Sequence, residues 1–150
     1  MDFEIVKTDS QNIGFVTLIK LLDEDLEERY GQLQKQYEKH NRVDYINDVV
    51  VMYKGKAAIA CGAFKEYDTN TIELKRMFVI KEHRKQGLAK AIIKELEDLA
   101  MSRGFKYAVL ETGIKQYEAI GLYKSIGYCV TQNYGPYIGN PNSVCMRKKL

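Results

Sequence analysis

A short polar turn, Arg84-Lys85-Gln86-Gly87-Leu88-Ala89, carries the most informative chemistry in the sequence. It lies between an apolar run that ends at Ile80 and a strongly amphipathic segment. A glycine in such a turn lets a ligand approach the backbone, and the first N–H groups of a helix can bind an anion. Arg84 and Lys85 would add cationic donors. The pattern indicates a pyrophosphate site, although a solvated basic turn before a helix explains the same residues.

A second pattern lies further along the chain, in Gln116-x-x-Ala119-x-x-Leu122-Tyr123-x-x-x-Gly127-Tyr128. It resembles the later helix N-x-x-A-x-x-L-Y-x-x-x-G-F of the GNAT superfamily of N-acetyltransferases. The turn at 84–89, read as R-x-x-G-x-A, is similar to the pyrophosphate-binding motif of the same superfamily. Two motifs separated by a helix and a strand are more specific together than either is alone. The motifs cover Glu73 to Tyr128, and the order of the expected elements extends the resemblance over essentially the whole chain.

The resemblance implies a cofactor site for acetyl-CoA, used as a co-substrate. In the superfamily the fourth and fifth strands splay apart, and the pantetheine arm lies between them like an extra strand. The backbone that meets this arm corresponds here to Met77, Phe78 and Val79. The pyrophosphate loop corresponds to Arg84, Lys85, Gln86, Gly87, Leu88 and Ala89. Gln116 stands where the superfamily usually has Asn, so it keeps the amide on a longer side chain.

Tyr123 and Glu73 are the expected catalytic residues. Tyr123 corresponds to the superfamily position whose hydroxyl approaches the cofactor sulfur, and a tyrosine that is protonated at neutral pH can donate to a leaving thiolate. Without the motif, packing on a helix face would explain Tyr123 better. Glu73 matches a glutamate that histone acetyltransferases of the superfamily use as a base, but an ion pair with Lys75 on the same strand face explains it almost as well. Glu111 is the reserve candidate.

The acceptor is expected to be an amine of a small molecule or a peptide, and the sequence says little more. An acidic cluster lies where the superfamily places its acceptor-binding helices: Asp23, Glu24, Asp25, Glu27 and Glu28. It could attract a cationic amine, but a solvated helix face is the commoner meaning of such a run. The loop Tyr134-Gly135-Pro136-Tyr137 could form another wall of the acceptor site. Whether the chain forms a homodimer is open.

Composition excludes several other classes of function. The net charge of +3 is small and scattered, which disfavours nucleic-acid binding. No apolar stretch approaches the roughly 20 residues of a membrane span, and the N-terminus does not resemble a signal peptide, so we expect a cytoplasmic protein. The three cysteines, Cys61, Cys129 and Cys145, lie in separate apolar runs and are expected to be buried, reduced and not nucleophilic. With only His40 and His83 as histidines, no metal site is expected.

Hydrophobic periodicity predicts a mixed α/β domain, residues 1–150, built around one mostly antiparallel sheet. Two helical stretches, 15–22 and 23–39, follow the first strand. In the main helix, 87–103, one apolar stripe is formed by Leu88, Ile92, Leu96 and Leu99. Four charged residues lie largely off this stripe: Lys94, Glu95, Glu97 and Asp98. The remaining helix spans 116–125. Strands are expected at 3–7, 49–53, 57–65, 71–80, 107–111, 128–132 and 143–149. The strand at 107–111 shows little alternation of polar and apolar residues, so we expect it to be central in the sheet.

These observations favour an acetyl-CoA-dependent N-acetyltransferase that transfers the acetyl group directly to an amine. Because a fold does not fix a function, a regulatory module that binds acyl-CoA without turnover stays an alternative. Acetyl and longer acyl donors are not distinguished by the sequence.

Overall fold

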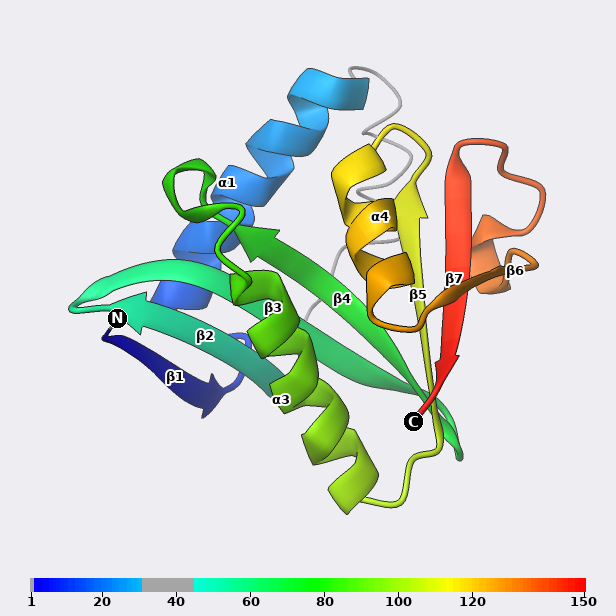
Figure 1. Ribbon diagram of the computed structural model, residues 1–150, viewed down its shortest axis with the longest axis horizontal. Coiled ribbons are helices and arrows are strands. Elements are labelled where there is room, and N and C mark those ends of the chain that lie inside the picture. Colours follow the sequence, from blue (N-terminus) through cyan, green and yellow to red (C-terminus); the bar gives the residue numbers. More distant parts are fainter. Residues whose placement is uncertain (1, 31–44) are drawn as a thin grey trace. The chain divides into compact units, whose positions relative to one another are not determined.

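The computed structural model describes residues 2–30 and 45–150. Seven strands form one sheet in the order β1-β2-β3-β4-β5-β7-β6 (Figure 1). They are β1 (Phe3–Thr8), β2 (Asp48–Lys54), β3 (Ala57–Asp68), β4 (Thr71–Val79), β5 (Tyr107–Gly113), β6 (Cys129–Thr131) and β7 (Ser143–Lys149). The α-helices of the described residues are α1 (Ile13–Tyr30), α3 (Leu88–Ser102) and α4 (Tyr117–Ser125), with single 3₁₀ turns η2 (Lys81–His83) and η3 (Gly135–Tyr137).

The predicted mixed α/β architecture is confirmed. β1 pairs with β2 and β2 with β3 in antiparallel register, as the short connections require. β5 lies inside the sheet, between β4 and β7. The only parallel pair among the described strands is β4 with β5, and its register covers three residues of each strand, Thr71–Glu73 and Tyr107–Val109. None of the described helices combines the length and apolar character needed to cross a lipid bilayer.

The junction predicted between residues 22 and 23 is wrong. The sequence suggested separate helical stretches at 15–22 and 23–39, but α1 runs unbroken through this junction to Tyr30. Its buried stripe of Phe15, Leu18, Leu22 and Leu26 continues across the acidic residues, so the helix has no reason to end there. The rest of the second stretch, together with His40, lies outside the described residues.

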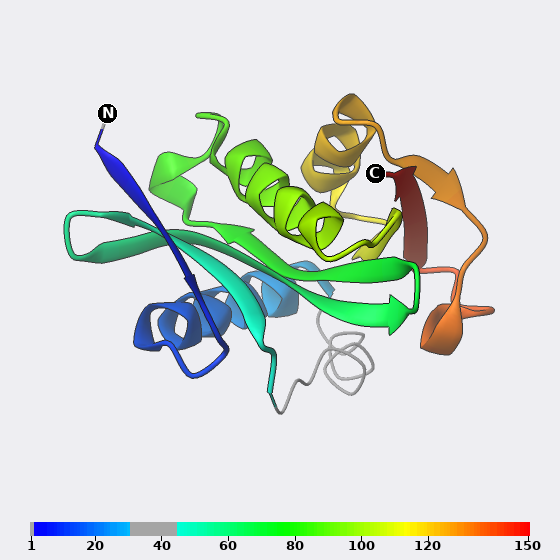
Figure 2. The ribbon, with the colours of Figure 1, turned by 90° about the horizontal axis from the view of Figure 1, so that it is seen from below.

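The chain divides into two compact units, so the prediction of one domain stays a prediction. The first unit comprises Met1–Lys65 and Lys75–Leu96, and the second comprises Glu66–Leu74 and Glu97–Leu150. In the first unit, α1 lies on one face of the strands and the beginning of α3 lies on the other (Figure 2). Alternate strand residues separate the two faces: Val49, Val51, Cys61, Ala63 and Phe78 pack with the buried side of α1.

Gly62 allows the beginning of α3 to approach β3 closely. A Cβ atom at Gly62 would meet the side chains of Met77 and Ile92, which lie on the α3 face of the first unit. A tight core has little room for an added methyl group, because neighbouring side chains must leave their preferred rotamers. This contact fixes Met77, one of the residues expected at the cofactor.

We predict that Gly62→Ala destabilises the protein by about 1–3 kcal/mol through overpacking. Gly121→Ala is the matched control, since Gly121 is exposed on α4 and a Cβ there meets nothing within 4 Å. Removing that glycine from a helix interior should raise stability by up to about 1 kcal/mol. Urea unfolding of both variants measures the difference. Equal stability of the two variants would show that β3 and α3 do not approach closely at Gly62.

Candidate active site

In the first unit, the turn before α3 has the backbone geometry that an anion site needs. Lys85 and Gly87 have positive φ angles of 65° and 78°. The chain then enters α3, and the N–H of Ala91 donates to the carbonyl oxygen of Gly87 at 3.2 Å. The preceding N–H groups at the start of α3 therefore have no acceptor within the helix. A Cβ at Gly87 would meet nothing within 4 Å, so the space beside this turn is open.

The side chain of Arg84 connects this turn to the end of β4. Its Nε donates to the carbonyl oxygen of Val79 at 3.0 Å, and its guanidinium lies 5.6 Å from the centre of the Phe78 ring. An ion pair of 3.7 Å joins it to Asp25 of α1. The structure thus brings together three of the predicted cofactor residues, Phe78, Val79 and Arg84. Lys85 and Gln86 are exposed beside them.

A backbone irregularity in β4 lies directly before the predicted cofactor residues Met77, Phe78 and Val79. Arg76 has a φ of 58°, which is unusual for a residue other than glycine and is strained in a strand. Two contacts hold it: Cys61 Sγ donates to its carbonyl oxygen at 3.4 Å, and its Nη1 donates to Asp23 at 3.1 Å. The sequence reasoning missed Arg76, because no glycine or proline marks the position.

The acidic cluster on α1 has a structural role at two of its five residues. Asp23 and Asp25 bind Arg76 and Arg84, which belong to β4 and to the turn that follows it. Glu24, Glu27 and Glu28 are exposed. The attraction of a cationic acceptor by this cluster stays a prediction, and two of its charges are already compensated.

In the second unit, Tyr123 is buried on α4, with only 7% of its surface exposed. Its ring packs edge-to-face on the Tyr128 ring, with 5.9 Å between centroids. Burial, and then the charge of Glu111, raise the pKa of Tyr123 above its usual value of 10. The phenol is therefore protonated at neutral pH, so its hydroxyl can donate a hydrogen bond or a proton.

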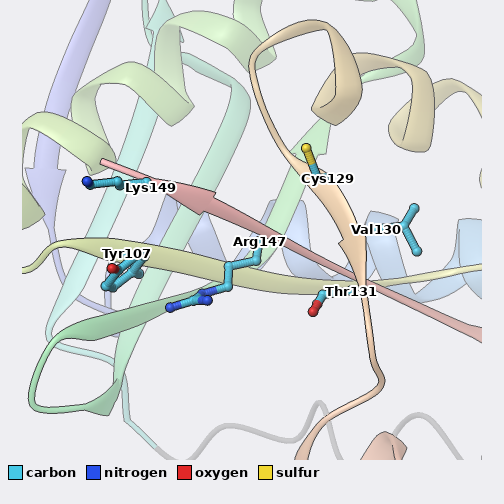
Figure 3. A pocket seen from close by; sticks show the side chains of 6 residues that line it. All are labelled: Tyr107, Cys129, Val130, Thr131, Arg147 and Lys149. Atoms are coloured by element: carbon cyan, nitrogen blue, oxygen red, sulfur yellow. The ribbon is translucent and has the colours of Figure 1, made fainter.

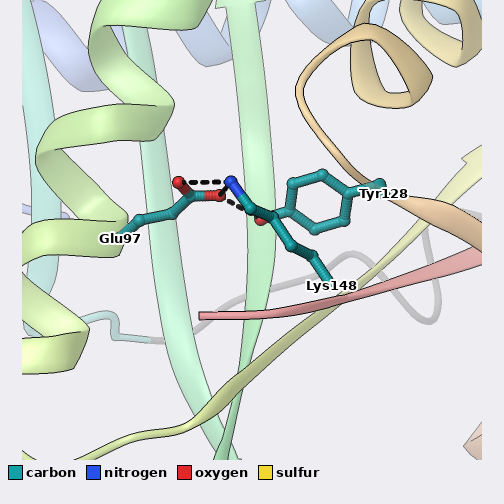
Figure 4. Close-up of polar contacts among 3 residues, drawn as sticks. All are labelled: Glu97, Tyr128 and Lys148. Atoms are coloured by element: carbon teal, nitrogen blue, oxygen red, sulfur yellow. Dashed lines mark hydrogen bonds and ion pairs between the residues drawn. The ribbon is translucent and has the colours of Figure 1, made fainter.

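A buried polar network holds the ring on which Tyr123 packs. Tyr128 donates its hydroxyl to Glu97 at 2.8 Å, and Lys148 Nζ lies 3.0 and 3.1 Å from the two Glu97 oxygens (Figure 4). Glu97 is only 8% exposed, although the sequence predicts that it lies largely off the apolar stripe of this helix. A buried carboxylate needs such partners, and Lys148 comes from β7, far away in sequence.

Gln116 lies at the turn from β5 into α4, just before the helix rather than inside it. Its Oε1 accepts hydrogen bonds from the Thr112 hydroxyl at 2.9 Å and from the Gly113 N–H at 3.0 Å. The side-chain oxygen thus accepts hydrogen bonds from the last two residues of β5, which gives Gln116 a structural role. A cofactor contact of Gln116 stays a prediction.

Glu73 accepts a 2.6 Å hydrogen bond from the Tyr134 hydroxyl. Burial and the charge of Glu73 raise the pKa of Tyr134. The reserve candidate, Glu111, accepts a 2.7 Å hydrogen bond from Ser143. Cys145 lies opposite Glu111 in the β5–β7 register, and burial followed by the charges of Glu111 and Glu73 raises the pKa of its thiol. Glu73 pairs with Val109, and Glu111 lies two residues beyond Val109, so both half-buried carboxylates lie on one face of the sheet in the second unit.

The prediction that all three cysteines are buried is wrong for Cys129. Cys61 and Cys145 are buried, whereas Cys129 is exposed. β6 has only three residues and is the last strand of the sheet, so nothing in the described residues pairs with its outer edge. The apolar run around Cys129 reflects strand formation there and not burial.

Comparison with known proteins identifies the class. The sequence profile of the acetyltransferase (GNAT) family matches residues 7–128. The chain therefore belongs to the GNAT acetyltransferase family, which confirms the prediction made from the two motifs.

Individual relatives agree with this assignment. YsnE of Bacillus subtilis, an uncharacterised N-acetyltransferase, is 37% identical over 100 residues, which are 65% of this chain and 66% of that protein. The match thus spans slightly less than two thirds of YsnE. A Klebsiella pneumoniae protein assigned as an acyl-CoA N-acyltransferase is 29% identical, with a TM-score of 0.81 over 99% of this chain and 97% of that one. The PaiA N-acetyltransferase of Thermoplasma acidophilum, solved with coenzyme A, shares the fold with a TM-score of 0.75 at 17% identity over the full length of both chains.

Proposed function

We propose that this chain transfers an acetyl group from acetyl-CoA directly to an amine of a small molecule or peptide. The observation that carries the proposal is the turn from Arg84 to Ala89, which has open space, positive φ angles and a helix N-terminus in a chain of the GNAT family. Backbone N–H groups and the helix dipole favour a pyrophosphate at such a place. The family match alone would leave the donor unspecified.

The first unit supplies the donor site in this proposal. Lys85, Gln86, Gly87, Leu88 and Ala89 bind the pyrophosphate, while Arg84 mainly fixes the turn, because Val79, Phe78 and Asp25 already engage its guanidinium. Met77, Phe78 and Val79 offer backbone groups to the pantetheine arm. The positive φ of Arg76 interrupts the regular pleat of β4 and so changes the direction in which these backbone groups point.

The second unit supplies the proton transfers. The amine nitrogen attacks the thioester carbonyl carbon, and the carbon–sulfur bond breaks. Glu73 takes the proton that the amine loses, and the Tyr123 hydroxyl gives a proton to the departing sulfur. Tyr134, hydrogen-bonded to Glu73, holds the carboxylate in one orientation. Glu111 is the second candidate for the base, and Ser143 orients it in the same way.

We predict that Gly87→Asp abolishes acetyl-CoA binding measured by calorimetry, because it places a side chain and a negative charge against the pyrophosphate. Gly139→Asp is the matched control: its φ of 79° equals that of Gly87 within a degree, it is exposed, and a Cβ there also meets nothing within 4 Å. Both variants place a side chain at nearly the same positive φ and make the same change of charge. Undiminished affinity in Gly87→Asp, or equal losses in both variants, would place the pyrophosphate elsewhere.

We predict that Tyr123→Phe lowers kcat by roughly 10- to 1,000-fold, the range expected for losing one positioned acid. The ring still packs on Tyr128, and acetyl-CoA affinity should change little because the hydroxyl acts as charge develops on sulfur. Tyr117→Phe, on the same helix but 72% exposed, should leave kcat unchanged. An unaltered kcat in folded Tyr123→Phe, with chemistry limiting the rate, would return Tyr123 to a packing role.

A further inference from the structure

The second unit holds an open pocket of about 280 Å³ that the proposed reaction does not use (Figure 3). Two cations and no carboxylate are among the described residues that line it: Tyr107, Cys129, Val130, Thr131, Arg147 and Lys149. Arg147 and Lys149 are exposed. A concave site with this lining favours a negatively charged group.

The aromatic ring of Tyr107 prepares Arg147 for such a group. The guanidinium carbon lies 4.0 Å from the centre of the Tyr107 ring, which is a close cation–π contact. A guanidinium stacked in this way keeps its N–H donors at its edge, where they can bind a carboxylate or phosphoryl group with two hydrogen bonds. The ring thus restricts Arg147 without consuming its donors.

Strand register places this pocket on the same face of the sheet as the candidate bases. Glu73 is paired with Val109, Val109 with Arg147, and Arg147 with Cys129. Directly paired residues point to the same face of a sheet, so Glu73 and Arg147 share one face. Glu73 lies on β4 and Arg147 on β7, with β5 between them. Two spacings of roughly 4.8 Å each put the backbones of these residues about 10 Å apart. Glu111, two residues beyond Val109, lies on this face as well.

We propose that the pocket binds a carboxylate or phosphoryl group of the amine acceptor, so that the acceptor is a small amine carrying an anionic group. This inference rests on the proposed function, because Glu73 marks the position of the reacting amine only if it is the base. The backbones of Glu73 and Arg147 lie about 10 Å apart, so the amine and the anionic group of the acceptor are expected to be on the order of 10 Å apart. Arg147 and Lys149 determine the specificity for the acceptor and take no part in the proton transfers.

A matched pair of amines tests this inference. The acid 8-aminooctanoate carries its amine and carboxylate about this distance apart when extended, and octylamine lacks the carboxylate. We expect a lower KM for 8-aminooctanoate than for octylamine. Arg147→Gln and Lys149→Gln should each raise the KM for 8-aminooctanoate roughly 10-fold, as expected for losing a hydrogen bond to a charged group. The kcat, the KM for acetyl-CoA and the KM for octylamine should not change.

Lys106→Gln is the control, since Lys106 is exposed and precedes Tyr107 but does not line the pocket. It removes one positive charge, as Arg147→Gln and Lys149→Gln do, and should leave the KM for 8-aminooctanoate unaltered. Equal KM values for the two amines, or equal effects of the Lys106 and Lys149 variants, would overturn the inference. Lys149→Gln leaves the Arg147–Tyr107 stack in place, so it tests the pocket even where Arg147→Gln perturbs the fold.

Alkylation of Cys129 provides a readout that needs no turnover. Cys129 lines the pocket and is exposed, whereas Cys61 and Cys145 are buried and burial raises the pKa of Cys61 to about 12. The two cations should speed the reaction of Cys129 with anionic iodoacetate relative to neutral iodoacetamide, and 8-aminooctanoate should protect Cys129. Both effects should weaken in Lys149→Gln and persist in Lys106→Gln. Absence of both effects overturns the anionic pocket. If both occur but no amine is acetylated, the proposed function fails and the anionic pocket stands.

Discussion

The pairing of β4 is the constraint on which the rest of this structure depends. β4 follows β3 in the antiparallel part of the sheet, but its parallel register with β5 ends at Glu73 and Val109. Glu73 is thus the last paired residue of β4 on that side, and the left-handed Arg76 follows three residues later. Backbone groups that leave a ladder need new partners, and an extended ligand can supply them. The short register therefore accounts for both the position of a candidate base and the backbone proposed to meet the donor.

Each unit stabilises its own part of the proposed chemistry with charged groups that are distant in sequence. In the first unit, Asp23 and Asp25 of α1 hold Arg76 and Arg84, so the acidic helix serves the strand and the turn. In the second unit, Glu97 and Lys148 hold Tyr128, which packs on Tyr123. Buried or half-buried ion pairs of this kind contribute little net stability, because desolvation opposes attraction, but removing one partner is costly. They fix orientations, which a positioned acid or a ligand-binding turn requires.

Local patterns predicted most of the fold, and long-range contacts explain what they missed. The strands and α3 follow from apolar periodicity, and the turn at Gly87 follows from its glycine and its place before a helix. The burial of Glu97 could not be predicted locally, because its partners Lys148 and Tyr128 lie far away in the sequence. Cys129 looked buried because an edge position depends on strand order. Arg76 carries no local signal for its positive φ, and the pocket beside Arg147 arises only when three strands are placed in register.

Amine-dependent consumption of acetyl-CoA tests the central claim most directly. Polyamines, amino acids, aminoglycosides and peptide N-termini are incubated with the protein and acetyl-CoA, and coenzyme A and the acetylated amine are quantified by chromatography and mass spectrometry. The proposed direct transfer predicts equal amounts of both products with at least one amine and no release of coenzyme A without an amine. Acetyl-CoA that binds tightly but is recovered intact with every amine would contradict the account and identify a binding module without turnover.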